Sequence, residues 1–432
     1  MLAAGLGTRM RSETPKHLHP LLGRRLVDWV IVAAGELGPE PLVVVTSPES
    51  QDAFGDLTVA VQAEPRGTGD AAAAARESLA SFRGDVFVVS GDAAAITSEL
   101  LGRLLETHRR EGAAATVLSF DRDDPGAYGR VVRDGERGLS AIVEATDASE
   151  DELLLNEVNS SIYVFVAEKL WPALERLRPE NAQGELYLTD TVRDLVAAGE
   201  RVAVHKAEDG AEAEGVNTRA DLAAAAAVLR DRLNERHMLA GATIVDPAST
   251  WIDPSVELEP DSTIHPFTVL RGETRVGRGA EVGPHAVAVD AEIGPDALVG
   301  PFCYLRPGTV LEAGAKAGAF VEVKNSRLGP GVKASHQSYI GDADIGEGTN
   351  IGAGNITANF PHEEGQPKGR TKIGRNVRTG VHNAFVAPVE IGDDAWIGAG
   401  SVITEDVPPE ALAIARQRQV TKEGYVRRKR EE

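Results

Sequence analysis

The sequence has little cysteine, few aromatic side chains and no long hydrophobic run. Its 432 residues include one cysteine, Cys303, which excludes an internal disulfide and a cysteine-ligated metal cluster. No stretch reaches the about 18 consecutive apolar residues that are typical of a membrane-spanning helix. Arg9 stands where an export signal would be apolar. We therefore expect a cytoplasmic protein that has no membrane insertion.

Basic residues are also in deficit. Lysine and arginine total 45 against 66 aspartates and glutamates, which gives a formal net charge of −21. A chain with this balance lacks the basic surface that nucleic-acid binding needs, so we expect no nucleic-acid partner. A local basic pocket can still bind a small anionic ligand.

Up to about residue 218, short apolar runs alternate with amphipathic stretches. The amphipathic stretches include 69–82 and 98–111, which have helical spacing. This alternation predicts an α/β, Rossmann-like domain over residues 1–218, with a parallel-rich sheet between helices. Ligands of such sheets bind beyond the carboxyl ends of the strands. The runs predicted as buried strands are 42–45, 86–90, 115–120 and 161–166.

A different segment follows this domain. Residues 220–239 contain neither glycine nor proline and consist largely of strong helix formers. Thr218 stands three residues before Asp221, a spacing close to that of a capping box. The pattern predicts a linker helix within residues 219–241.

From about residue 244 an aliphatic residue, usually followed by glycine, recurs every six residues. This period predicts a three-sided β-solenoid over residues 242–432, with one aliphatic side chain pointing inward from each side of each coil. Interruptions at 359–371 and from Arg416 onward are where solenoids often build a binding face. The repeating positions are Val276, Val282, Ile293, Val299, Leu305, Leu311, Ala317, Val323, Leu328, Ala334, Ile340, Ile345, Ile351, Ile373, Thr379, Ile391, Ile397 and Ile403.

A glycine-rich loop with two cations opens the first domain. Gly5 and Gly7 allow a phosphate to approach the backbone closely, and successive amides of such a loop present hydrogen-bond donors to it. Arg9 and Lys16 can neutralise a polyphosphate. The pattern therefore predicts a nucleotide-phosphate site.

Polar side chains interrupt the solenoid at positions where a purely structural repeat would not need them. Arg306 and Lys324 are one coil apart, so they stack on one side and can bind one phosphate together. His336 lies about two sides further round and would meet them only near an edge or across a subunit boundary. Its imidazole titrates in the range that a general base for amine acetylation needs.

Taken together, these features resemble the bifunctional N-acetylglucosamine-1-phosphate uridyltransferases / glucosamine-1-phosphate acetyltransferases, over essentially the whole chain. The resemblance implies acetyl transfer from acetyl-CoA to glucosamine-1-phosphate, then uridylyl transfer from UTP to N-acetylglucosamine-1-phosphate with release of pyrophosphate. It also implies Mg²⁺, a left-handed parallel β-helix, a homotrimer and a role in making UDP-N-acetylglucosamine for the bacterial cell envelope. The motifs that carry it are LAAGLGTRM (2–10), QAEPRGTGDA (62–71), SGD (90–92), YGRVV (128–132), IVE (142–144), EVNSSIY (157–163), ELYLTD (185–190) and GVNTR (215–219).

The resemblance implies roles for individual residues. Those matched to UTP and the UDP-sugar are Leu2, Ala3, Ala4, Gly5, Lys16, Gln62, Gly67, Thr68, Ser90, Gly91, Asp92, Gly129, Glu144, Asn159 and Asn217. Asp92 and Asn217 match the magnesium ligands, Arg9 and Lys16 act on the phosphates, and His336 matches the catalytic base. Those matched to glucosamine phosphate are Arg306, Lys324, Tyr339 and Asn350. Those matched to acetyl-CoA are Ala353, Asn359, Phe360, Ala399 and Arg416.

The chain departs from the family at several points. Only Met1 precedes Leu2, where relatives carry the apolar residues of a first strand, so we expect a truncated strand and a true start upstream. Ser90 replaces a tyrosine, and Phe360 replaces another. Val381 replaces a serine that contacts acetyl-CoA near the thioester, which predicts a change in acetylation efficiency or in the acyl donor.

Two other interpretations remain open at this point. The chain could be another sugar-1-phosphate nucleotidyltransferase whose solenoid is structural, or a degenerate paralogue that serves as a trimeric binding module. The retained Asp92, Asn217 and His336 argue against the second of these. Turnover of acetyl-CoA and of UTP separates the three.

Overall fold

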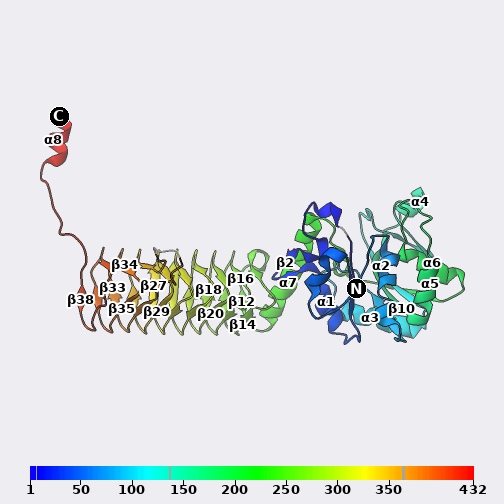
Figure 1. The fold of residues 1–432 in the computed structure, drawn as a ribbon, viewed down its shortest axis with the longest axis horizontal. Coiled ribbons are helices and arrows are strands. Elements are labelled where there is room, and N and C mark those ends of the chain that lie inside the picture. The colour runs from blue at the N-terminus through cyan, green and yellow to red at the C-terminus, as the bar shows by residue number, and fades with distance from the viewer. Residues whose placement is uncertain (6, 136–137, 362–364) are drawn as a thin grey trace. The chain divides into compact units, whose positions relative to one another are not determined.

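The structure is a computed structural model that describes residues 1–5, 7–135, 138–361 and 365–432. The chain divides into two units, Met1–Leu229 and Arg230–Glu432 (Figure 1). Within the described ranges, no helix combines the length and the apolar character that crossing a membrane requires.

The first unit contains two main sheets. A three-stranded parallel sheet has the order β1 (Leu2–Ala3), β4 (Val43–Thr46), β5 (Thr58–Val61). A six-stranded sheet has the order β11 (Val202–Lys206), β7 (Ala115–Asp121), β10 (Glu157–Val166), β8 (Arg130–Asp134), β9 (Gly138–Val143), and β6 (Asp85–Val88) also pairs with β10. The four predicted strands are present.

The larger sheet is mixed. β11 runs parallel to β7, but β10 runs antiparallel to β6, β7 and β8. The β8–β9 hairpin lies between β7 and β10 in the chain, and it reverses the chain direction before β10 begins. A short antiparallel pair, β2 (Pro20–Leu21) and β3 (Arg24–Arg25), stands apart from both sheets.

Helices accompany these strands. They are α1 (Leu26–Gly35), α2 (Thr68–Ala74), α3 (Ser98–Glu111), α4 (Glu150–Leu153), α5 (Ala167–Arg176) and α6 (Leu188–Ala197). The helix predicted over 98–111 is confirmed, with Thr97 as its N-cap and Gly112 in the left-handed conformation at its end. The prediction over 69–82 is wrong in its second half, because Arg76, Leu79 and Phe82 donate to carbonyls three residues back and form tight turns instead.

A cavity of about 320 Å³ lies beside β1. β1 has two residues, Leu2 and Ala3. The Met1 α-amino group donates to Val43 O (2.8 Å), and its burial lowers its pKa to about 5. The apolar cavity lining comes from strands β4 and β6 and from helices beside them, including Val43, Val86, Val88, Leu101 and Trp171.

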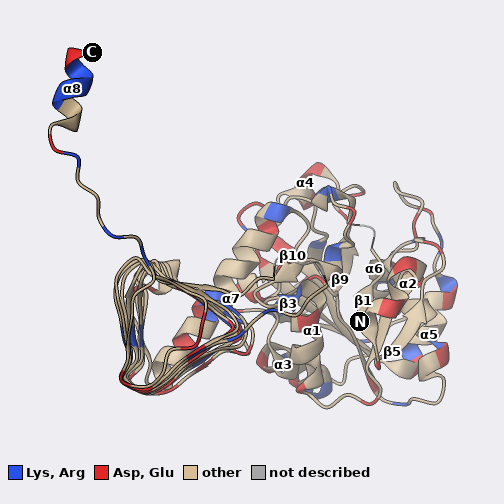
Figure 2. Ribbon diagram, turned by 60° about the vertical axis from the view of Figure 1, so that its left-hand side comes forward, with Lys and Arg blue, Asp and Glu red and all other residues tan. Residues whose placement is uncertain are grey.

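The second unit is a three-sided parallel β-helix, and Figure 2 shows its triangular section. Its first side consists of β12 (Thr243–Ile244), β15 (Thr263–Ile264), β18 (Glu281–Val282), β21 (Leu298–Val299), β24 (Lys316–Ala319), β27 (Lys333–His336), β30 (Asn350–Ile351), β33 (Arg378–Thr379), β36 (Trp396–Ile397) and β38 (Leu412–Ala413). Its second side consists of β13 (Trp251–Ile252), β16 (Val269–Arg271), β19 (Val287–Val289), β22 (Tyr304–Leu305), β25 (Glu322–Lys324), β28 (Tyr339–Gly341), β31 (Ile356–Ala358), β34 (Ala384–Val386) and β37 (Val402–Ile403).

The third side completes each coil. It consists of β14 (Glu257–Leu258), β17 (Arg275–Val276), β20 (Ala291–Ile293), β23 (Thr309–Leu311), β26 (Arg327–Leu328), β29 (Ala343–Ile345), β32 (Thr371–Ile373) and β35 (Val389–Ile391). Every aliphatic position that the six-residue period selected is buried in the core of this β-helix. The predicted solenoid is therefore confirmed, in a form consistent with a left-handed parallel β-helix.

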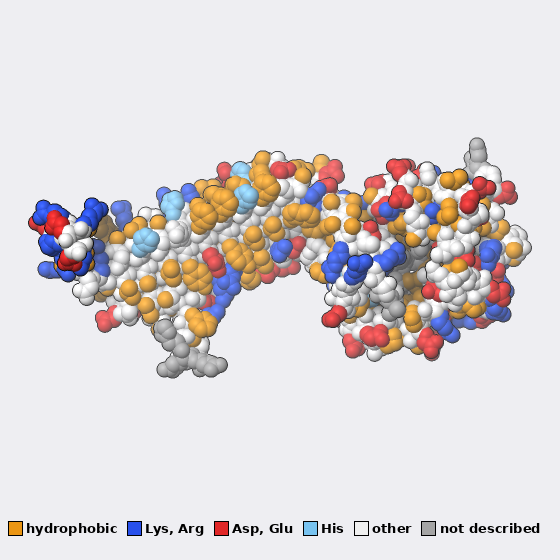
Figure 3. Space-filling view, turned by 90° about the horizontal axis from the view of Figure 1, so that it is seen from above, with side chains coloured by type: hydrophobic (Ala, Val, Ile, Leu, Met, Phe, Trp, Pro, Cys, Tyr) orange, Lys and Arg blue, Asp and Glu red, His pale blue; other side chains and the backbone are white. Residues whose placement is uncertain are grey.

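The three sides differ in what they present outward. The third side presents mostly charges of both signs, with ion pairs such as Arg275–Glu257 (3.4 Å) (Figure 2). The second side presents mainly apolar and aromatic residues, among them Val269, Val287 and Tyr304. At the corner between the first and second sides, the rings of Phe267, His285, Phe302 and Phe320 stack with centroids 4.7, 4.9 and 5.2 Å apart. Figure 3 shows hydrophobic side chains gathered along the β-helix.

The helix predicted within residues 219–241 is present as α7 (Arg219–Leu239). Its first half packs on the first unit through Leu222, Ala225 and Leu229. In its second half, Asn234 Nδ2 donates to Pro247 O (2.9 Å) and Thr250 O (3.0 Å) of the second unit. A last helix, α8 (Tyr425–Glu431), has no buried residue.

Candidate active sites

The glycine-rich loop that contains Gly5 and Gly7, which is predicted to bind nucleotide phosphate, follows β1 directly. Gly7 has φ +62°, and a Cβ at this position would collide with the side chain of Lys16. Gly91 donates from its amide to Leu2 O (2.8 Å), and a Cβ there would stand 2.9 Å from that same oxygen. Glycine at both positions therefore allows the loop and the residue pair Gly91–Asp92 to approach β1 closely. Leu6 of this loop lies outside the described residues.

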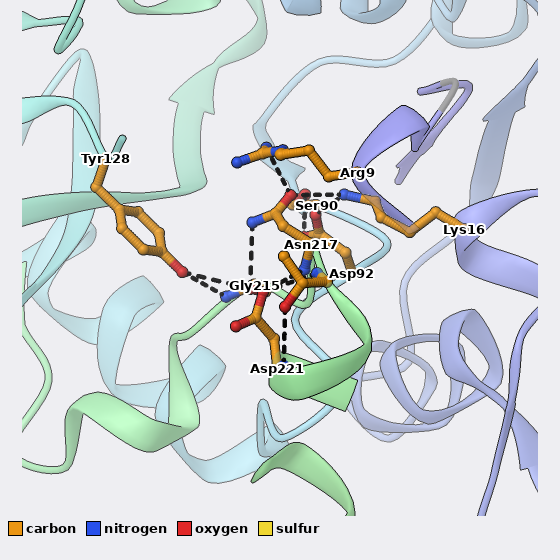
Figure 4. A network of polar contacts seen from close by, with 9 residues as sticks. Arg9, Lys16, Ser90, Asp92, Tyr128, Gly215, Asn217 and Asp221 are labelled. Atoms are coloured by element: carbon orange, nitrogen blue, oxygen red, sulfur yellow. Dashed lines mark hydrogen bonds and ion pairs between the residues drawn. The ribbon is translucent and has the colours of Figure 1, made fainter. Parts of the chain in front are cut away.

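Four predicted residues meet beyond the end of β6 (Figure 4). Lys16 Nζ forms an ion pair with Asp92 Oδ2 and donates to Asn217 Oδ1 (3.1 Å). Arg9 donates to the same Asn217 oxygen (2.9 Å). Burial raises the pKa of Asp92, but Lys16 and the hydroxyl of Ser90 outweigh this effect, so the pKa lies below its usual value. The carboxylate is therefore charged.

Asp92 and Asn217 form a donor set that suits a divalent cation. Both contribute hard oxygen ligands, and both oxygens contact one ammonium group, Lys16 Nζ, so they are close enough to share an ion. Mg²⁺ commonly takes few protein oxygens and completes its shell with phosphate oxygens and water. Among the described residues, no group of three or more His, Cys, Asp or Glu side chains offers an alternative metal site.

Residues predicted to bind the sugar form a second group. The backbone amide of Asn159 donates a hydrogen bond to Gly129 O (2.9 Å), and a Cβ at Gly129 would stand 3.4 Å from Glu144 Oε2. Glu144 accepts a hydrogen bond from Thr189 Oγ1 (3.0 Å), and burial raises its pKa. Asn159 Nδ2 donates to the buried Tyr163 hydroxyl (2.7 Å). The structure therefore brings Gly129, Glu144 and Asn159 together.

Gln62, Gly67 and Thr68, three of the residues matched to UTP, also lie together. Gln62 Nε2 donates to Gly67 O (3.1 Å) and to Asp70 Oδ2 (2.9 Å). Thr68 Oγ1 accepts from the amide of Leu188 (3.0 Å) at the start of α6. These bonds fix the loop before α2.

In the β-helix, cations gather at the corner between the second and third sides. Arg306 and Lys324 stand on successive coils, and Arg306 donates to Glu322 Oε1 (2.8 Å). A Cβ at Gly341, the residue in register with Lys324, would collide with the ring of Tyr339. Lys368 lies beside Lys324, whose hydrogen bond and charge lower the pKa of Lys368.

The sequence patterns did not predict a role for Lys368. It belongs to the insertion 359–371, of which residues 362–364 lie outside the described residues. The six-residue period stops in this insertion, so no pattern marked Lys368. A cation in an insertion next to predicted phosphate ligands was the one available signal.

His336 lies at the opposite edge of the second side. It ends β27, and backbone bonds join its corner to three later coils: Gly354 N to Gln337 O (2.9 Å), His382 N to Ala353 O (2.8 Å) and Gly400 N to Val381 O (2.9 Å). These bonds place His336, Ala353, Val381 and Ala399 in one row along that corner. Within one chain the full width of the second side separates His336 from Arg306 and Lys324.

The remaining predicted residues fall in three places. Asn359 is buried and donates to Asp342 at the corner of the cations, and Phe360 is 76% exposed there, with Lys368 5.8 Å from its ring centroid. Asn350 points outward from the first side. Arg416 is exposed beyond β38. One chain therefore presents the residues predicted for acetyl transfer at two corners, on the first side and beyond β38.

These observations define a nucleotidyltransferase domain followed by a hexapeptide-repeat β-helix, and comparison with known proteins supports this class. The family model of MobA-like NTP transferase domains matches residues 1–240. The protein named bifunctional protein GlmU of Streptomyces avermitilis is 48% identical, over 100% of this chain and 94% of its own length. Its namesakes are 45% identical in Mycobacterium bovis (100% and 92%) and 42% identical in Caldanaerobacter subterraneus subsp. tengcongensis (99% and 96%). The chain belongs to the bifunctional GlmU family.

Proposed function

We propose that this protein makes UDP-N-acetylglucosamine by two transfers. The β-helix transfers an acetyl group from acetyl-CoA to the amine of glucosamine-1-phosphate. The first unit transfers uridylyl from UTP to N-acetylglucosamine-1-phosphate and releases pyrophosphate. The observation that carries the proposal is the meeting of Arg9, Lys16, Asp92 and Asn217 in a chain of this family. Since both transfers consume cytosolic metabolites, we place the enzyme in the cytoplasm.

Uridylyl transfer needs positioning and charge neutralisation more than proton transfer. The sugar-phosphate oxygen attacks the α-phosphorus of UTP, and the bond to the bridging oxygen of pyrophosphate breaks. Phosphate is already a nucleophile, so no general base is required. Arg9 and Lys16 bind the β- and γ-phosphates and stabilise the negative charge of the leaving group. Mg²⁺, held by Asp92 and Asn217, would neutralise further phosphate charge.

Acetyl transfer requires a neutral amine. His336 accepts a proton from the substrate ammonium, the amine attacks the thioester carbonyl, and the bond to the coenzyme A sulfur breaks. Arg306, Lys324 and Lys368 bind the sugar phosphate. The acyl donor binds along the row of His336, Ala353, Val381 and Ala399.

This second site is complete only between copies of the chain. His336 and the cations occupy opposite edges of the second side, so one copy supplies the base and another supplies the phosphate ligands. The outward apolar residues of the second side favour its burial between copies, whereas the charged third side favours solvent. A closed ring of three copies satisfies both, because each copy then offers its two edges to different neighbours.

Two assays test the proposal. Pyrophosphate release from UTP with N-acetylglucosamine-1-phosphate reports the first transfer, and free thiol release from acetyl-CoA with glucosamine-1-phosphate reports the second. We expect Asp92→Asn to lower only the first by about 10²-fold or more, and His336→Ala to lower only the second similarly. Each variant is the control for the other. If the unaltered protein released pyrophosphate but no thiol, the β-helix would have only a structural role. If it released neither, the protein would be a binding module and not an enzyme.

A further inference from the structure

A tyrosine hydroxyl contacts the loop that carries Asn217. Tyr128 lies between β7 and β8, directly before Gly129. Its hydroxyl accepts a hydrogen bond from Gly215 N (3.0 Å) and donates one to Gly215 O (3.4 Å) (Figure 4). One side chain therefore bonds both polar groups of a residue that is 87 positions away.

The ring of Tyr128 is held on two sides. Phe120 packs edge-on against it, with centroids 5.4 Å apart and an interplanar angle of 85°. The guanidinium of Arg122 stands 5.3 Å from the ring centroid and forms an ion pair with Glu214 (3.3 Å). The hydroxyl is therefore aimed at Gly215 by contacts that do not depend on the hydroxyl itself. Burial raises the pKa of Tyr128, so the hydroxyl stays able to donate.

Gly215 in turn contacts both side chains that suit a metal ion. A Cβ at Gly215 would stand 3.0 Å from Asp92 Oδ1, so the peptide packs on the carboxylate. The next residue, Val216, donates its amide to Asp92 O (3.0 Å). Asn217 Nδ2 donates to Gly215 O (3.3 Å), which turns the amide oxygen of Asn217 toward Lys16. The carbonyl that orients Asn217 is thus the one that the tyrosine hydroxyl also binds.

We propose that Tyr128 is a positioning residue for the cation site of uridylyl transfer. Its hydroxyl fixes the Gly215 peptide, and this peptide sets the Asn217 amide so that its oxygen and the Asp92 carboxylate face one ion. Tyr128 does not touch the reacting atoms. Because Gly129 belongs to the sugar region, the same side chain ties the sugar loop to the loop of Asn217. The inference rests on the proposed uridylyl transfer.

The variant Tyr128→Phe removes the hydroxyl and keeps the ring contacts. We expect the metal concentration for half-maximal pyrophosphate release to rise about tenfold, the effect of losing one hydrogen bond, while kcat at saturating metal changes less than threefold. Binding of Mn²⁺ in the presence of UTP, followed by electron paramagnetic resonance, should weaken by a similar factor. Tyr425→Phe, in exposed helix α8, is the matched control and should change neither quantity.

Amide hydrogen exchange tests directly whether the Tyr128 hydroxyl fixes the Gly215 peptide. In the unaltered protein the Gly215 amide should exchange slowly, and in Tyr128→Phe the segment 213–217 should exchange faster with other segments unchanged. Unprotected exchange of Gly215 in the unaltered protein, or an unchanged metal requirement in the variant, would overturn the proposal. If the unaltered protein released no pyrophosphate, the proposed function would fail, and the exchange measurement would still decide whether Tyr128 fixes Gly215.

Discussion

Lys16 contacts the two side chains that suit a divalent cation. Its ammonium stands between Asp92 Oδ2 and Asn217 Oδ1, at the place where an ion would bind both oxygens. A cation held by both oxygens would take the place of this ammonium. Lys16 would then be available to bind nucleotide phosphate, so cation binding and phosphate binding would be linked.

Replacing Lys16 by methionine tests this link. Pyrophosphate release should fall at least about 10²-fold, because a phosphate ligand is lost. Mn²⁺ binding without nucleotide should tighten, because Asp92 no longer has a competing partner. Electron paramagnetic resonance measures the second effect, and Lys16→Arg, which keeps the charge, should not show it. An unchanged Mn²⁺ affinity in Lys16→Met would contradict the competition.

Val381 lies in the row of His336, where a ligand can contact it. It is 46% exposed, and its side chain can offer no hydrogen bond. We expect Val381→Ser to raise thiol release several-fold, because one hydrogen bond to the acyl donor is worth about 1 kcal/mol. Val381→Ala separates the hydroxyl from the loss of bulk. Equal rates for the serine variant and the unaltered protein would remove any role for this substitution.

His17 makes the stability of the first unit depend on pH. It is 3% exposed, stacks on Phe54, and its Nε2 has no hydrogen-bond partner in the described part of the chain. Burial lowers its pKa most, the charges of Lys16 and Arg25 lower it further, and the resulting pKa is about 4. The pKa of histidine in the unfolded chain is about 6.5. At pH values between about 6.5 and 4, the unfolded chain therefore binds a proton at this residue that the folded chain does not bind.

The free energy of unfolding should therefore fall as the pH drops from about 6.5 to 4, by at most about 1.4 kcal/mol per pH unit for this residue. His17→Phe keeps the stacking and removes the titration. Urea unfolding at pH 7 and pH 5, followed by circular dichroism, should show a smaller loss for the variant. Equal losses would mean that other groups carry the pH dependence.

At the scale of elements, the sequence predicted best where one local rule acts alone. Every aliphatic side chain that the six-residue period selected is buried in the β-helix, because each coil repeats the same packing problem. Helix α3 was predicted at both ends, because Thr97 and Gly112 mark them. The antiparallel direction of β10 was not predicted, since strand direction depends on connections rather than on the residues of the strand. The proposed roles of Lys368 and Tyr128 were missed because each depends on a neighbour distant in sequence, Lys324 for Lys368 and Gly215 for Tyr128.

At the scale of the whole molecule, the proposed acetyl-transfer site needs residues from more than one copy, whereas the proposed uridylyl site lies within one copy. Val287→Arg places a charge on the outward apolar surface of the second side. We expect this variant to be monomeric by light scattering, to lose thiol release and to keep pyrophosphate release. Val310→Arg, on the charged third side, is the control and should keep both activities. A trimeric, acetylating Val287→Arg variant would show that copies meet elsewhere.

The stacked coils have a consequence for how this protein can vary. Each strand of a side bonds only to the strands of the coils before and after it, from β12 through β38. A whole turn removed ahead of Arg306 would shorten the prism by one strand spacing, about 4.8 Å, and leave every later coil with an equivalent neighbour. The length of the rod can therefore change in discrete steps, by deletion or duplication of a turn, while the chemistry at its corners persists.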